Sequence, residues 1–132
     1  MPRSCFYKKV QSGQQRAIYE SVRRANAAAE DMLKPGVPLC EVDIAARQII
    51  EDAGYGPNFT HRLGHFIGLE VHEYGDVSSA NTKVAEVGNI FSIEPGIYVE
   101  GEVGVRIEDL VLITEDGCEI LNSFSKELDI VE

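Results

Sequence analysis

The amino-acid sequence predicts an α+β fold in which two helices precede a mainly antiparallel sheet. Apolar residues recur at helical spacing as far as about residue 52, and from Tyr55 onward glycines, β-branched residues and short apolar runs take over. No linker, internal repeat or low-complexity segment separates the two parts. Helices that are grouped before the strands, instead of alternating with them, are typical of the α+β class.

The first predicted helix starts at a capping-box pattern formed by Ser12 and Gln15. It stops at the Lys-Pro-Gly run of residues 34–36, because proline cannot continue a helix. The apolar positions between these two signals follow the helical repeat and form the predicted core face: Ile18, Val22, Ala25, Ala29 and Met32.

A second, shorter helix is predicted from about Glu41 to Asp52, with Gly54 as its stop signal. Its apolar side comprises Val42, Ala45, Ala46, Ile49 and Ile50.

Strands are predicted where apolar and β-branched residues are concentrated downstream. These segments are Asn89 to Glu94, Gly104 to Thr114 and Cys118 to Leu121. The Glu-Asp-Gly run at 115–117 is a hairpin turn signal, so the last two strands are expected to pair antiparallel.

Length and charge limit the classes of protein that the chain can belong to. With 132 residues, a single domain over residues 1–132 with one core is expected. A net charge of -10 argues against nucleic-acid binding, because phosphate contacts need clustered Lys and Arg residues.

Cysteine usage and hydropathy indicate a cytoplasmic protein. Cys5, Cys40 and Cys118 are an odd number at wide spacing, which argues against a disulfide framework and for a reducing compartment. No run approaches the roughly 18 consecutive apolar residues that a membrane span needs, and the first residues lack an apolar signal core.

Histidines and glutamates in the second half of the chain indicate a metal site. All three histidines, His61, His65 and His72, fall within twelve residues, and Glu94 and Glu108 stand in apolar, strand-like runs. Imidazole and carboxylate together are ligands for divalent metals such as manganese, cobalt or zinc. Metal-assisted hydrolysis is therefore the first functional hypothesis.

Each of these residues also has a simpler explanation. Arg106 and Glu108 share one face of the predicted strand, so the guanidinium alone could neutralise the carboxylate. Glu94 at a strand end is ordinary for a solvated carboxylate, and His65 for a hydrogen-bonded core histidine. Coincidence explains the whole set less well than it explains any single member.

Three blocks of the sequence closely resemble, in the same order, blocks of the Xaa-Pro aminopeptidases and Xaa-Pro dipeptidases (prolidases). The blocks are G-H-F-I-G-L-E-V-H-E at 64–73, S-I-E-P-G-I-Y at 92–98 and V-R-I-E-D-L-V-L-I-T at 105–114. These enzymes are pita-bread dinuclear metallopeptidases. The resemblance runs from about Phe6 to Leu128 and corresponds to the carboxy-terminal half of the family's catalytic domain.

The resemblance implies a fold, a reaction and metal ligands. It implies half of a pita-bread domain, and hydrolysis of the peptide bond before proline by a metal-bound hydroxide. The metal is expected to be manganese, with cobalt or zinc as alternatives. His65 would be a terminal ligand, Glu94 a ligand that also acts as general base, and Glu108 a carboxylate that bridges two ions.

Three further residues match motif positions outside the metal ligands. His61 and His72 look like the histidines that bind the substrate carbonyl or stabilise the tetrahedral intermediate. Arg106 looks like the arginine that orients the bridging carboxylate. The substrate would be a peptide with proline in its second position.

Departures from the family pattern lower the expected activity. The family's other two ligands are aspartates just upstream of where this chain begins, and residues 1–5 contain neither. Two glutamates cannot balance the four positive charges of a dinuclear centre, so weak or partial metal occupancy is expected. Phe66 stands where the family usually has glycine, so its ring would either intrude on the metal pocket or fill vacated space.

Resemblance to one half of a domain carries two more expectations. A half domain would leave a sheet edge uncovered, so two copies are expected to associate across it. The alternative to an impaired peptidase is a catalytically inactive relative or fragment that acts as a binding module.

Overall fold

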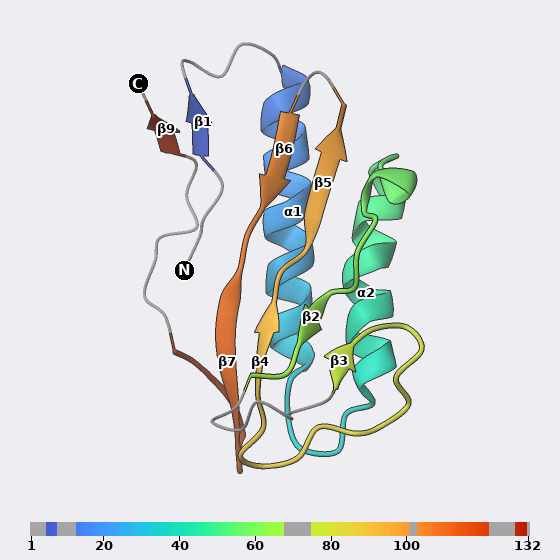
Figure 1. Cartoon of the computed structure of the whole chain (residues 1–132), viewed down its shortest axis with the longest axis vertical. Helices are drawn as coiled ribbons and strands as arrows, with labels where there is room; N and C mark the ends of the chain where they lie inside the picture. The colour runs from blue at the N-terminus through green and yellow to red at the C-terminus, as the bar shows by residue number, and fades with distance from the viewer. Residues whose placement is uncertain (1–4, 8–12, 68–74, 101–102, 122–128, 132) are drawn as a thin grey trace.

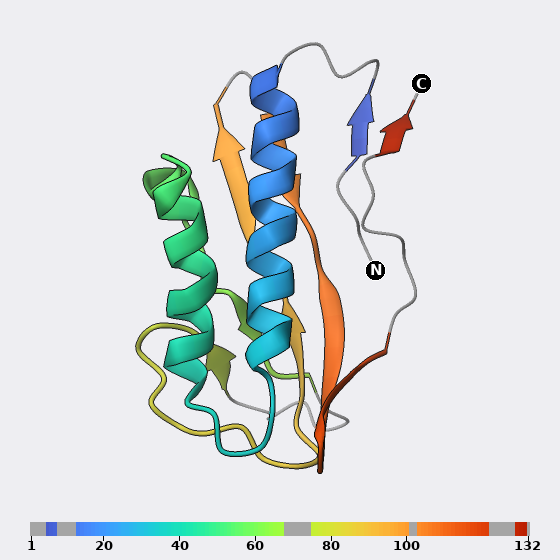
Figure 2. The same cartoon turned by 180° about the vertical axis from the view of Figure 1, so that it is seen from behind.

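Two helices cover one face of a bent, largely antiparallel sheet (Figure 1), and from behind both helices lie in front of the strands (Figure 2). The computed structural model describes residues 5–7, 13–67, 75–100, 103–121 and 129–131. The predicted α+β class is confirmed. Within the described residues, neither helix is long and apolar enough to cross a membrane.

Helix α1, Gly13–Met32, buries the predicted face. Ile18, Val22, Ala25 and Ala29 are fully buried, whereas Met32 packs at the edge of the core. Burying such a stripe stabilises a helix by roughly 1.5–3 kcal/mol for each large aliphatic side chain, which is why the sequence periodicity is informative. The capping box lies outside the described residues at Ser12.

Helix α2, Leu39–Asp52, begins two residues before its predicted start and packs against α1. Val42, Ala46 and Ile50 are fully buried, as predicted, while Ala45 and Ile49 are only partly buried. The helix ends as expected, because Gly54 takes a φ of 92° and its N–H donates to the carbonyl of Glu51.

The sheet consists of two antiparallel ribbons, one of three strands and one of two strands. The central set has the order β4-β7-β8, with β4 at Ile90–Ile93, β7 at Asp109–Thr114 and β8 at Gly117–Ile120. Strand β5, Gly96–Val99, continues from β4 and pairs with β6, Val103–Arg106, which leads into β7. The hairpin predicted at 115–117 joins β7 to β8.

One predicted strand is wrong in its extent. The segment Gly104 to Thr114 is divided into β6 and β7 at Ile107 and Glu108, and β5 was not predicted. The division lies opposite Pro95, which has no N–H to contribute to the ladder, although its carbonyl accepts a hydrogen bond from Ile107 at 3.2 Å.

Several elements of two or three residues were not predicted, because so few residues show no periodicity. Strand β2, Gly64–His65, pairs antiparallel with β3, Asp76–Val77, and lies beside β4 through the bridge between Phe66 and Phe91. A single 3-10 turn covers Gly56–Asn58. At one side of the molecule (Figure 1), β1, Cys5–Tyr7, pairs parallel with β9, Asp129–Val131.

The two faces of the sheet differ in what covers them. Alternate residues on β4 and β7 face the helices and are almost completely buried: Phe91, Ile93, Asp109, Val111 and Ile113. On the other face, no described helix lies over the sheet (Figure 1), and Ile90, Leu110 and Leu112 remain half-buried. Glu108 has the same parity as Leu110, so it belongs to this second face.

Candidate metal centre

Glu94 and Glu108 face each other across the break between the two ribbons. Ile93 pairs with Asp109 below the break, and Gly96 pairs with Arg106 above it. The same register continued from either side sets Glu94 directly opposite Glu108. Two ionised carboxylates directly opposite in an antiparallel pair repel one another, and a cation or a shared proton between them would relieve this repulsion.

His65 is brought beside this pair by direct main-chain packing of β2 on β4. A Cβ atom at Gly64 would collide with the carbonyl oxygen of Ser92, so only glycine allows this approach. The His65 N–H donates to Ser92 Oγ at 3.0 Å, and the Glu94 N–H donates to the Leu63 carbonyl at 2.7 Å. Gly64 is therefore the residue that lets the main chain of β2 approach β4 closely.

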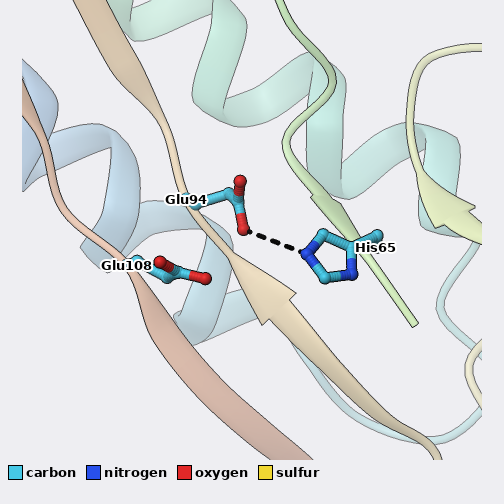
Figure 3. Close-up of side chains that lie close together, drawn as sticks. All are labelled: His65, Glu94 and Glu108. Carbon is cyan, nitrogen blue, oxygen red and sulfur yellow. Dashed lines mark ion pairs between the residues drawn. The ribbon is translucent and has the colours of Figure 1, made fainter. Parts of the chain in front are cut away.

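The three side chains converge from three different strands or strand ends, as Figure 3 shows. One ligand atom from each of His65, Glu94 and Glu108 lies within 4.8 Å of the others. His65 Nε2 is 3.6 Å from Glu94 Oε2, and the imidazole side chain is 40% exposed against 14% for Glu94. The cluster is thus anchored on the sheet and open on the histidine side.

Electrostatics at the cluster favour a cation. Burial raises the pKa of Glu108, and its hydrogen bond with Glu94 and the negative charge of that residue raise it further, against the lowering effect of Arg106 and His65. Glu94 Oε2 is buried and has no hydrogen-bond partner among the described residues. One imidazole and two carboxylates around such an oxygen fit a single divalent cation of the manganese, cobalt or zinc type.

The other site residues predicted from the sequence lie around the cluster. His61 Nε2 is 2.8 Å from the main-chain carbonyl of Glu94, and its ring packs against Phe59 and Tyr98. A carbonyl only accepts, so Nε2 carries the hydrogen. Arg106 is exposed and on the same sheet face as Glu108, whose pKa its charge lowers. His72 lies outside the described residues.

Phe66 follows His65 in the chain but is not one of the three candidate ligands. Its ring packs against that of fully buried Phe91 at a centroid distance of 5.3 Å, and a Cβ at Gly75 would touch it. It also lines a cavity of about 500 Å³ with residues such as Leu39 and Asn89. The ring therefore fills space next to β4.

Sequence reasoning missed two groups that hold the site together. Asp43 and Arg47 on α2 form an ion pair of 3.0 Å that also binds the segment leading to His65. A signal was present, because Asp43 stands at a core-facing position of the helical repeat, next to Val42. Ser92, the acceptor for the His65 N–H, gave no such signal, since a buried serine in a strand is ordinary.

Most of the chain is similar to one family of proteins. The model of metallopeptidase family M24 matches residues 3–115. An uncharacterized peptidase of Staphylococcus haemolyticus is 52% identical over 115 residues, which is 87% of this chain and 33% of that protein. The chain spans about a third of the length of the curated relatives that it matches.

Solved structures give the same result at the level of the fold. The crystal structure of dipeptidase PepE from Mycobacterium ulcerans is 42% identical, with a TM-score of 0.91, over 98% of this chain and 34% of that one. Prolidase from Pyrococcus furiosus is 46% identical, with a TM-score of 0.82, over 86% of this chain and 34% of that one.

Proposed function

The chain belongs to metallopeptidase family M24, and from this premise we propose that it is one half of a catalytic domain that hydrolyses the bond before a proline, the half that carries three of the metal ligands. The family and the half pita-bread fold predicted from three sequence blocks agree with the matched model and the similar structures. The similar structures include a dipeptidase and a prolidase, which supports a short peptide with proline in its second position as the substrate.

The observation that carries this proposal is the convergence of His65, Glu94 and Glu108 within 4.8 Å. Residues 29 and 14 positions apart would meet at one point for no structural reason that the core requires, since none of the three is part of the apolar core. Members of this family depend on divalent metals, and the three residues are the metal ligands that we propose.

Glu94 and Glu108 are proposed to have different roles in the reaction. A bound cation would lower the pKa of a water molecule and polarise the carbonyl oxygen of the substrate. Glu94 is proposed as the general base, because its Oε2 makes no hydrogen bond to the described residues and can take a proton. Glu108, with its charge offset by Arg106, is proposed to hold the cation from the opposite strand.

The histidines outside the ligand set are proposed to act on the substrate. The Nε2–H of His61 donates to the carbonyl of Glu94, so only Nδ1 remains for a substrate. Nδ1 can donate a hydrogen bond to a substrate carbonyl only when the ring is protonated to imidazolium. His72 is proposed for the same role on the strength of its motif. The order of preference for the metal is manganese, then cobalt or zinc.

Activity of this chain alone is proposed to be impaired. Two glutamates balance the charge of one divalent ion and not of two, so a single weakly held ion is expected. Catalysis that relies on a pair of ions would then be slow or absent in the 132-residue chain.

Metal stoichiometry measured together with hydrolysis of an Xaa-Pro dipeptide tests the proposal. In excess manganese we expect about one ion per chain, little turnover, and loss of the ion in Glu94→Gln. Two ions with turnover abolished by Glu94→Gln would instead indicate a complete enzyme. Absence of any bound ion would overturn the proposal and favour an inactive binding module.

A homodimer and a cytoplasmic location are proposed as accompanying properties. The sheet face that carries Leu110 and Leu112 has no described helix over it, and a second copy could cover this face and the adjoining edge. Light scattering that gives a monomer at micromolar concentration would contradict the dimer. Free thiols at Cys40 and Cys118 agree with a reducing compartment such as the cytoplasm.

A further inference from the structure

An ion pair on α2, with Asp43 buried and the Arg47 side chain 25% exposed, contacts the segment that leads to the candidate metal centre. Asp43 is completely buried, and its two carboxylate oxygens accept from Arg47 Nε at 3.0 Å and from Arg47 Nη2 at 3.2 Å. Its Oδ2 also accepts from the main-chain N–H of Leu63 at 3.1 Å. Burying a carboxylate is unfavourable unless hydrogen-bond donors surround it. Asp43, Arg47 and the main-chain N–H of Leu63 therefore form one hydrogen-bonded unit.

The guanidinium of Arg47 binds the same segment at two more points. Its Nη1 donates to the carbonyl of Phe59 and its Nη2 to the carbonyl of His61, both at 2.9 Å. The Cζ atom stands 4.0 Å from the centre of the Phe59 ring. A planar fork with donors on two sides can make all these contacts at once, which a lysine ammonium cannot.

Residues 59–63 connect this unit to the proposed general base. The segment contains no helix or strand, so its main-chain groups depend on side chains for partners. On its other side it holds Glu94 at both ends of the residue, since Leu63 accepts from the Glu94 N–H at 2.7 Å and His61 donates to the Glu94 carbonyl at 2.8 Å.

We propose that Arg47, held in place by Asp43, is a positioning residue that fixes the His61–Leu63 segment, and through it the tautomer of His61 and the main chain of Glu94. The contacts of Arg47 are with Asp43 and with the main chain and the Phe59 ring of this segment, so its effect on the cluster is exerted through the segment. The part of this inference that concerns metal affinity rests on the proposed function. The part that concerns the His61 tautomer does not.

The tautomer is measured first, on the full chain without metal. In ¹⁵N–¹H spectra of the imidazole rings, the His61 signal, assigned with His61→Gln, is expected to show hydrogen on Nε2. Arg47→Lys keeps the charge but loses the fork, and should give a mixture of tautomers. Arg23→Lys, at an exposed ion pair on α1, is the chemical control and should leave the signal unchanged.

Cobalt titration followed by absorption spectroscopy is the second readout. Arg47→Lys should weaken Co²⁺ binding about tenfold, the size seen when groups that orient a metal ligand are removed. Ile50→Val, a fully buried change on the same helix, controls for lost stability and should weaken it much less at an equal drop in melting temperature. Asp43→Asn serves as the second variant and should change both readouts in the same direction.

The outcomes separate the two proposals. A wild-type tautomer and wild-type Co²⁺ affinity in Arg47→Lys and Asp43→Asn would overturn the positioning role, as would Ile50→Val reproducing both changes. A wild-type chain that binds no Co²⁺ would count against the proposed function. The tautomer would still decide whether Arg47 positions His61.

Discussion

Glu94 and Glu108 stand opposite each other at the break in the antiparallel ribbon, where the register of the flanking pairs Ile93–Asp109 and Gly96–Arg106 continues. The fold thus sets two carboxylates opposite each other on one sheet face and brings the imidazole of His65 to the same point. Without a cation, like charges in this position oppose folding. The site is therefore expected to reduce the stability of the metal-free protein.

Neutralising one carboxylate should stabilise the metal-free protein. We expect Glu108→Gln to raise the free energy of unfolding by about 0.2–1 kcal/mol at neutral pH, because it removes the repulsion from Glu94. Thermal melts in the presence of a chelator measure this. Glu119→Gln, an exposed glutamate on β8, is the matched control and should change stability very little. A destabilised Glu108→Gln would contradict the repulsion argument.

The same effect should depend on pH. The folded-state pKa of Glu108 is raised above its ordinary value of 4.5, mainly by burial and then by Glu94. The stabilising contribution of this group is therefore fully present below pH 4.5 and is lost as the pH rises through the raised pKa. Urea unfolding in chelator should show Glu108→Gln gaining over the wild type between about pH 4 and pH 7. A difference in the free energy of unfolding between the two proteins that stays constant over this pH range would contradict this explanation.

The sequence predicted those parts of the fold that follow a period. Helix α1 and the central residues of α2 come from one apolar stripe each, and β4 lies within the predicted segment. The boundary between β6 and β7 was missed, because periodicity alone does not reveal a ladder interrupted by a proline on the neighbouring strand. The two-residue strands β2 and β3 carry no detectable alternation at all.

The residues of the candidate site also differ in how far the sequence alone predicts them. Glu94 and Glu108 could be predicted as candidate ligands because burying a carboxylate in an apolar strand is unfavourable without a partner. The core-facing position of Asp43 was a signal of burial, but the role of the pair could not be assigned, because an Asp and an Arg four positions apart on a helix usually form a surface pair. Only the tertiary contacts with the carbonyls of Phe59 and His61 give that pair its place in the site.

Removing the imidazole should abolish the response to metal while preserving the fold. His65 is 40% exposed on its side chain, so His65→Asn is expected to fold normally. For the wild type, a cation at about 100 times its dissociation constant should add about 2.7 kcal/mol to the free energy of unfolding. Differential scanning calorimetry with manganese should show this increase in the wild type and little of it in His65→Asn. Reversal by chelator is the control, and an equal increase in both proteins would remove His65 from the ligand set.

Adding one methyl group at Gly64 should disrupt the site from the backbone. A Cβ there would collide with the carbonyl of Ser92, so β2 would have to move away from β4 and carry His65 away from Glu94. Overpacking of this kind destabilises proteins by about 1–3 kcal/mol, and we expect Gly64→Ala to lose both stability and metal affinity. Gly117→Ala is the control, because its Cβ would be 3.6 Å from the nearest atom, the Leu33 carbonyl oxygen, an ordinary contact. Chemical denaturation combined with manganese titration compares the two variants. Wild-type metal affinity in Gly64→Ala would mean that the approach of β2 to β4 does not position His65.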